Sequence, residues 1–225
     1  MFGVGAHFAH ARARRHPSVV GHLFGAKGAV ELFDLEKTAE SLETAKTFIA
    51  KLASEGKTIL LVSGKAEACD LLRSTAEKAN LPYVAGRWIG GTLTNFPEIK
   101  RRVDRLEKLV EEREKGELGK FTKLERLRID REIEDLERSF GGLKTMARVP
   151  DALLVIDPRR EHIAVAEARK VKVPVIALLN SDCDASLISY PIPANDASVK
   201  SIAFFLGELA AAYIAASPKG DAPRA

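Results

Sequence analysis

The chain has 225 residues, of which 46% are hydrophobic and 29% are charged, and it carries a net charge of +4 with only two cysteines. This composition is typical of a globular protein with a buried core, and it excludes a disordered chain or a small disulfide-stabilised scaffold. The first residues lack the apolar core of a secretory signal, and the most apolar stretch, 202–216, contains Glu208 and is shorter than the ~20 residues of a membrane span. We therefore expect a soluble, cytoplasmic protein without membrane contact.

Residues 1–28 form a basic segment, because the first acidic side chain of the chain is Glu31. The cations of this segment are Arg12, Arg14, Arg15 and Lys27. We predict that the segment meets a polyanion first, and a disordered basic tail is the alternative. His7 and His10 have the spacing of a zinc pair, but no Cys, Asp or Glu nearby completes a tetrahedral site, so we expect no metal from this chain alone.

Residues 29–95 alternate between strand-like and helix-like patterns. Residues 29–33 alternate as a half-buried strand does, and 35–56 carry apolar residues at helical spacing. Residues 57–62 ("KTILLV") form a continuous apolar run, which is typical of a parallel strand covered on both faces. A helix over 65–80 and a short strand over 82–85 complete this part.

Residues 96–140 contain no strand signal and predict an antiparallel helical hairpin. Apolar residues recur there at intervals of four and three, the narrow seam of a two-helix coiled coil. The seam residues are Ile99, Val103, Leu106 and Val110 on the first helix and Ile129, Ile133, Leu136 and Phe140 on the second. Gly116 and Gly119 mark the turn. We expect the hairpin to be an insertion that projects from a sheet domain.

Residues 141–216 return to the alternation of strands and helices. The predicted elements are a strand over 151–157, a helix over 159–171, strands over 173–179 and 189–193, and a helix over 195–216. Asn195 or Asp196 is expected to cap the last helix. Repeated strand–helix–strand units predict one α/β domain, assembled from 29–95 and 141–216 around a doubly wound, mostly parallel sheet. Residues 217–225 have no core-forming side chain and are expected to be a flexible tail.

The loops after the parallel strands are where a doubly wound enzyme would bind its ligand. After the strand 57–62, Ile59 and Ala66 stand where a phosphate-binding P-loop requires other residues. Lys65 is therefore interpreted as a solvent residue at the start of a helix.

The two later loops offer acidic residues. Asp157 is interpreted as a helix N-cap, with Pro158 at the helix start, rather than as a catalytic acid beside His162. Asp182 and Asp184 favour a turn over a cation site. The sequence predicts no catalytic residue and no cofactor, and a doubly wound nucleotide- or sugar-phosphate-binding enzyme is the alternative.

The stretch "GRWIGGTLTNFPEIKRR", from residue 86 to residue 102, is interpreted as a docking corner. Arg87 and Trp88 form a basic-aromatic pair that can lie against a sugar–phosphate chain. The alternative for Trp88 is a core residue at the base of the hairpin. Thr94 or Asn95 is expected to cap the following helix, and the glycine pair permits a sharp turn.

Several of these stretches together resemble a known family. They are "GAHFAHARARRHP", "LEKT", "GRWIGGTLTNF", "LERSFGGLKTM", "PDALLVIDPRREHIAVAEARKVKVPVIALLNSDCD" and "YPIPANDASVKSI". In this order they resemble the universal small-subunit ribosomal protein number two in its bacterial form, over roughly residues 2–213.

The resemblance implies a flavodoxin-like sheet domain with a protruding coiled-coil hairpin, and a structural role in translation without enzymatic activity. The implied partners are small-subunit rRNA, neighbouring small-subunit proteins and the mRNA-binding ribosomal protein number one, with no small-molecule substrate. The motifs and the basic segment together predict the rRNA-binding residues His7, Arg12, Arg14, Arg15, Lys27, Arg87, Trp88, Thr92, Asn95, Lys100 and Arg101.

Overall fold

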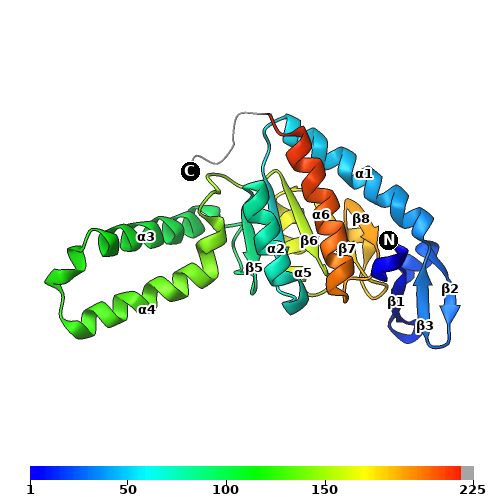
Figure 1. Ribbon diagram of the computed structural model, residues 1–225, viewed down its shortest axis with the longest axis horizontal. Coiled ribbons are helices and arrows are strands. Elements are labelled where there is room, and N and C mark those ends of the chain that lie inside the picture. The colour runs from blue at the N-terminus through cyan, green and yellow to red at the C-terminus, as the bar shows by residue number, and fades with distance from the viewer. Residues whose placement is uncertain (219–225) are drawn as a thin grey trace.

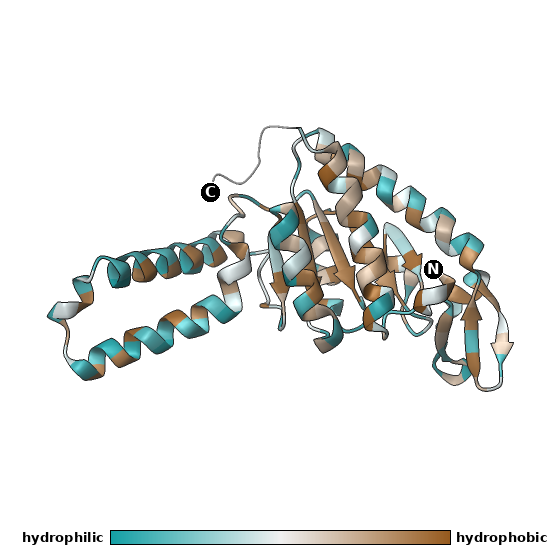
Figure 2. Cartoon of the chain, viewed as in Figure 1, coloured by the Kyte–Doolittle hydropathy of each residue, from teal (hydrophilic) through white to brown (hydrophobic). Residues whose placement is uncertain are grey.

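The computed structural model describes residues 1–218, so most of the predicted tail, 217–225, lies outside the described residues. Figure 1 shows three parts along the long axis of the molecule: a small sheet made by the N-terminal segment, a larger sheet flanked by helices, and a projecting helical hairpin. The strands of the larger sheet are mainly hydrophobic, whereas the hairpin is mainly hydrophilic with apolar residues at intervals (Figure 2).

The larger sheet has five parallel strands. They are β4 (Ile59–Ser63), β5 (Tyr83–Ala85), β6 (Ala152–Ile156), β7 (Val175–Leu179) and β8 (Tyr190–Pro193). Their order across the sheet is β5-β4-β6-β7-β8, with registers such as Leu61 opposite Tyr83. Every residue of β4, β6 and β7 is buried, as their continuous apolar runs predict. The predicted parallel α/β sheet is confirmed.

Helices cover both faces of this sheet. On one face lie α1 (Leu35–Ser54), α2 (Ala66–Ala79) and α6 (Val199–Ala216), and on the other lies α5 (His162–Lys170). By length and composition alone α6 could cross a membrane. Its side chains Ile202, Phe205 and Leu209 are instead buried in the core shared with α1 and α2. We therefore read α6 as a core helix.

The N-terminal segment is folded rather than a disordered tail. The strand predicted at 29–33 forms as β3 (Val30–Phe33), but it pairs antiparallel with β1 (Phe8–Ala11) and β2 (Leu23–Lys27) instead of joining the parallel sheet. Short 3-10 turns, η1 (Phe2–Val4), η2 (Arg12–Arg14) and η3 (Pro17–His22), complete the segment. The sheet is attached beside β8, since the Asn195 backbone N–H donates to the carbonyl of Ala6 at 3.0 Å.

The hairpin consists of α3 (Phe96–Glu114) and α4 (Lys123–Phe140), joined through η4 (Glu117–Lys120). Leu106, Leu109 and Ile133 form its buried cluster. The predicted seam is thus right for the outer half, although Leu109 is more buried than its neighbour Val110. At the base, the predicted seam residues Ile99, Val103 and Phe140 pack into the core of the sheet domain, because there the nearest apolar surface is the sheet and not the other helix.

The return from the hairpin passes very close to the edge strand β5. A Cβ added at Gly142, in η5 (Gly141–Leu143), would lie 2.3 Å from the carbonyl oxygen of Tyr83. This contact is with backbone, which cannot rotate away. Only glycine therefore lets η5 lie against β5 and fix the angle of the hairpin.

We expect Gly142→Ala to lower the free energy of unfolding by roughly 1–3 kcal/mol, because the backbone must shift to admit the methyl group. The control is Gly119→Ala, since nothing lies within 4 Å of an added Cβ there, and its effect should stay within about 0.5 kcal/mol. Urea denaturation of both variants measures the difference. Equal stabilities would show that η5 is free to move away from β5.

Candidate nucleic-acid interface

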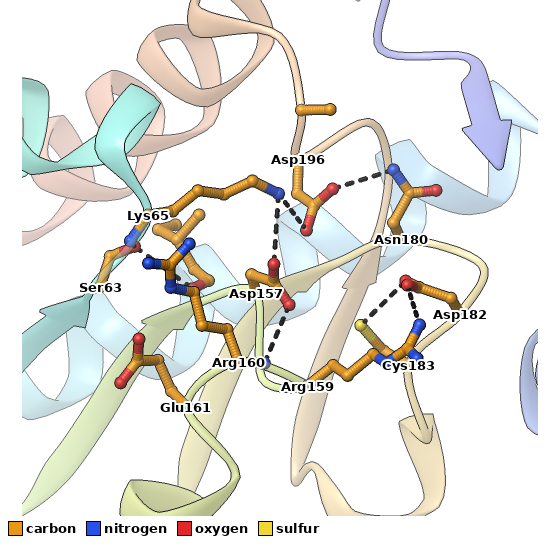
Figure 3. A network of polar contacts seen from close by, with 12 residues as sticks. Ser63, Lys65, Asp157, Arg159, Arg160, Glu161, Asn180, Asp182, Cys183 and Asp196 are labelled. Atoms are coloured by element: carbon orange, nitrogen blue, oxygen red, sulfur yellow. Dashed lines mark hydrogen bonds and ion pairs between the residues drawn. The ribbon is translucent and has the colours of Figure 1, made fainter. Parts of the chain in front are cut away.

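The carboxyl edge of the parallel sheet, where a doubly wound enzyme would bind its ligand, is filled by side chains of the chain itself. Lys65 lies at its centre (Figure 3), with Nζ 3.2 Å from Oδ2 of Asp157 and 3.1 Å from Oδ2 of Asp196. Burial alone would lower the pKa of Lys65, but the two aspartates outweigh it and raise that pKa. The interpretation of Lys65 as a solvent residue is therefore wrong: it is a charged residue of a buried network.

The helix caps predicted for this edge are also wrong. The helix after β6 begins at His162, and Asp157 instead has a φ of 63° and accepts from the backbone N–H of Arg160 at 3.2 Å. The last helix follows Ser198. Asp196 accepts from Nδ2 of Asn180 at 2.9 Å, an interaction that ties two loops together. These side chains serve tertiary contacts because their partners come from loops distant in the sequence.

A carboxylate of the chain accepts the hydrogen bond that a backbone N–H would otherwise donate to a bound phosphate. Oε1 of Glu161 accepts from the backbone N–H of Gly64 at 2.7 Å, directly after β4. Burial raises the pKa of Glu161, and the Gly64 hydrogen bond opposes that shift. A Cβ at Gly64 would lie 2.7 Å from the carbonyl oxygen of Gly86, so the loop is tightly packed. The backbone N–H of Gly64 is therefore not free to bind a phosphate.

The N-terminal segment packs against the loop after β7. The backbone N–H of His10 donates to Oδ1 of Asn180 at 3.2 Å and to Oγ of Ser181 at 3.0 Å. Asp182 pairs with Arg159, and Asp184 accepts from Ser186, as turn chemistry predicts. Within residues 1–218, no group of three or more His, Cys, Asp or Glu side chains is arranged to hold a metal ion.

The tryptophan corner, residues 86–95, is held by one buried carboxylate that sequence reasoning did not single out. Glu167 of α5 accepts from the backbone N–H groups of Gly91, Leu93 and Thr94, from Nε1 of Trp88 and from Oγ1 of Thr94 at 2.8–3.2 Å. Burial would raise its pKa, but these donors outweigh burial and lower it. The available signal for Glu167 was its position in one helix beside Ala164 and Ala168, which are buried.

Two predicted RNA-binding residues lie inside this corner. Trp88 is only 6% exposed and Thr92 only 1%, and the Thr92 hydroxyl donates to the carbonyl of Ile89 at 2.6 Å. The core alternative for Trp88 therefore describes its position. Asn95 occupies the N-cap position of α3, as one of the two expected residues, but its side chain makes no capping hydrogen bond.

The other predicted RNA-binding residues differ in whether their side chains are exposed and whether they are already paired. Arg12, Arg14, Lys27, Arg87, Asn95 and Arg101 are exposed. Arg15 is held by the buried Glu31, with Nη1 2.9 Å from Oε1, and Lys100 pairs with Asp104 at 3.1 Å. Arg101 lies 3.2 Å from Glu98. The ring of His7 is stacked on that of Phe2, with centroids 4.5 Å apart, and is tilted against that of Phe8, with centroids 4.1 Å apart.

The predicted residues form two groups at opposite edges of the parallel sheet. His7, Arg12, Arg14, Arg15 and Lys27 belong to the small sheet beside β8, whereas the residues from Arg87 to Arg101 follow β5 (Figure 1). The exposed surface therefore offers basic groups at two separated places, and the edge between them has a pocket of about 290 Å³ among the loops after β6 and β7. Such an arrangement suits a large anionic partner better than a small substrate.

Comparison with known proteins agrees with this geometry. The family model described as "Ribosomal protein S2" matches residues 1–216. The chain belongs to this family. It is 42% identical over 210 residues to small ribosomal subunit protein uS2 of Roseiflexus castenholzii, covering 93% of this chain and 80% of that relative. It is 39% identical to the protein of the same name from Coprothermobacter proteolyticus, with 93% and 78% covered. The predicted family, and the prediction of a structural protein rather than an enzyme, are confirmed.

Proposed function

We propose that this protein is a structural component of the small ribosomal subunit that binds small-subunit rRNA through the exposed cations of its N-terminal sheet. The proposal is carried by family membership together with a folded basic segment that contains no acidic residue. In this segment Arg12, Arg14 and Lys27 are exposed to solvent. Its place of action is the cytoplasmic ribosome.

The structure of the segment supports a rigid RNA-binding surface. Arg15 is bound to Glu31 and so contributes to folding, while its two arginine neighbours in η2 make no ion pair within the described part of the chain. The backbone on both sides of η2 is anchored to the loop after β7, because His10 and His16 both donate from their backbone N–H groups to residues of that loop. A backbone that is already ordered loses less conformational entropy when its cations meet phosphates.

Two finer features belong to the same proposal. We describe the sheet domain as flavodoxin-like and the hairpin as a coiled coil, supported by the strand order and by the four-three apolar seam. The family resemblance further supports contacts with neighbouring small-subunit proteins and docking of the mRNA-binding ribosomal protein number one. The Lys65 network and the Glu161–Gly64 hydrogen bond occupy the loop after β4, and this speaks against the nucleotide-binding alternative.

Replacing Arg12, Arg14 and Lys27 with alanine should weaken binding to small subunits from which this protein has been removed. Each lost phosphate contact reduces the slope of log affinity against log salt by roughly 0.7–0.9. The variant should therefore lose about two units of slope, measured by equilibrium binding at graded KCl concentrations. Circular dichroism verifies that the variant is folded.

A control variant carries the same change in charge elsewhere. Lys51, Lys78 and Arg126 are exposed and make no ion pair within residues 1–218, and we call their replacement by alanine the control triple. It should leave the slope unchanged. If the N-terminal variant and the control triple behave alike, the N-terminal sheet does not contact RNA phosphates.

A further inference from the structure

A basic groove lies between the hairpin and the edge of the parallel sheet. It has a volume of about 820 Å³ and is lined from α2, β5, the loop after β5, both hairpin helices and η5. That volume is within the range of ligand sites in proteins, and it is too small for a double helix. Its cationic lining residues are Arg73, Arg87, Arg113, Arg138 and Lys144, against the acids Glu134 and Glu137.

Three of these cations have no counter-charge. Arg138 pairs with Asp135 at 3.2 Å and Lys144 with Glu137 at 2.7 Å. Arg73, Arg87 and Arg113 form no ion pair or side-chain hydrogen bond within the described chain. Other hairpin cations are paired, Arg105 with Glu132 across the helices and several more along one helix. Three unpaired guanidinium groups from α2, the corner and α3 thus converge on one concave surface.

The groove is preformed by contacts that the chain makes on its own. Gly142 places η5 against β5, and Ile99 and Val103 anchor the start of α3 in the core of the sheet domain. Tyr83 also lines the groove, but its ring packs against Gly142, where an added Cβ would lie 2.8 Å from Cδ2 and 2.9 Å from Cε2. A rigid basic cleft suits single-stranded nucleic acid, because the backbone follows the cleft and its phosphates meet the cations in turn.

The geometry points to this groove as a second RNA site, which takes an unpaired segment of rRNA along the junction of the hairpin and the sheet domain. The inference rests on the proposed function and adds the form of RNA and the residues that receive it. Arg73, Arg87 and Arg113 contact its phosphates. The hairpin is then a wall of a binding cleft as well as a projecting arm.

The groove triple, in which Arg73, Arg87 and Arg113 are all replaced by alanine, tests the site. Binding is measured on the same protein-depleted small subunits at graded KCl concentrations, beside the control triple. We expect at least a tenfold loss of affinity and a loss of roughly two units of slope, since single strands release about 0.7 counterion per phosphate. The single variant Arg113→Gln, at an exposed position on the hairpin, should show part of the loss if the triple is not folded.

A photo-crosslinking residue at Ser139, which lines the groove, identifies the occupant. Crosslinks to rRNA support the site, whereas crosslinks only to another ribosomal protein overturn it and assign the groove to an acidic protein segment. Equal slopes for the groove triple and the control triple, with normal binding by the unmodified protein, also overturn it. If the unmodified protein itself fails to bind the depleted subunits, the proposed function fails instead.

Discussion

Glu167→Ala should lower the free energy of unfolding by roughly 3–5 kcal/mol, which would be a large effect for one substitution. The carboxylate accepts five hydrogen bonds from the tryptophan corner, three of them from backbone N–H groups. Without it, buried donors lose their acceptor and cannot reach water. The corner should loosen, and the fluorescence of Trp88, the one tryptophan of the chain, should report that change.

The exposed acid Glu107 provides the control, and Glu107→Ala should change stability by no more than about 0.5 kcal/mol. The effect of Glu167 should also depend on pH. Because its pKa is held below the ordinary value of 4.5, its stabilising effect is present above pH 4.5 and disappears as the pH falls through the lower folded-state value. The difference in unfolding free energy between the unmodified protein and Glu167→Gln should therefore decrease as the pH is lowered. A difference that does not change with pH would argue against an ionised Glu167.

Lys65→Met should also cost about 3–5 kcal/mol of unfolding free energy, because it leaves the buried Asp196 and the half-buried Asp157 without their cation. The side chain of Lys65 is 13% exposed and that of Asp196 only 2%. Methionine has a similar length but no charge, so the loss comes from electrostatics rather than from packing. Thermal and urea unfolding measure the effect.

Lys46 is a matched control, since it also bridges two carboxylates, Glu43 at 2.9 Å and Glu208 at 3.1 Å. Those acids are largely exposed, and such pairs contribute about 0–1 kcal/mol. Lys46→Met should therefore be nearly neutral. Similar losses for the two lysine variants would mean that the network around Lys65 is well solvated.

The sequence predicts the elements of this fold well where the pattern is local. Continuous apolar runs identify β4, β6 and β7 because burial on both faces requires every side chain to be apolar. The four-three spacing identifies the hairpin, since its helices form their own small core around Leu106 and Ile133. Gly116, with a φ of 72°, ends the first helix as glycine commonly does.

The prediction fails where a residue's role depends on a partner distant in the chain. Lys65 resembles a surface lysine until Asp157 and Asp196 are placed beside it, and Glu167 gains its role only when the loop from Trp88 to Thr94 folds over α5. The same reason applies to β3, which follows the strand pattern but pairs with β1 and β2. Likewise, no local pattern reveals that Arg73 and Arg113 line one groove.

The attachment of the N-terminal segment to the last loops determines when this protein can finish folding. The backbone N–H of His10 donates to Asn180 and Ser181, and the carbonyl of Ala6 accepts from Asn195. The N-terminal residues can therefore reach their folded positions only after these late residues have been synthesised. At roughly 5–20 residues per second, that delay during translation is about 8–35 s. A nascent chain released before those loops emerge carries its arginines without the framework that orients them.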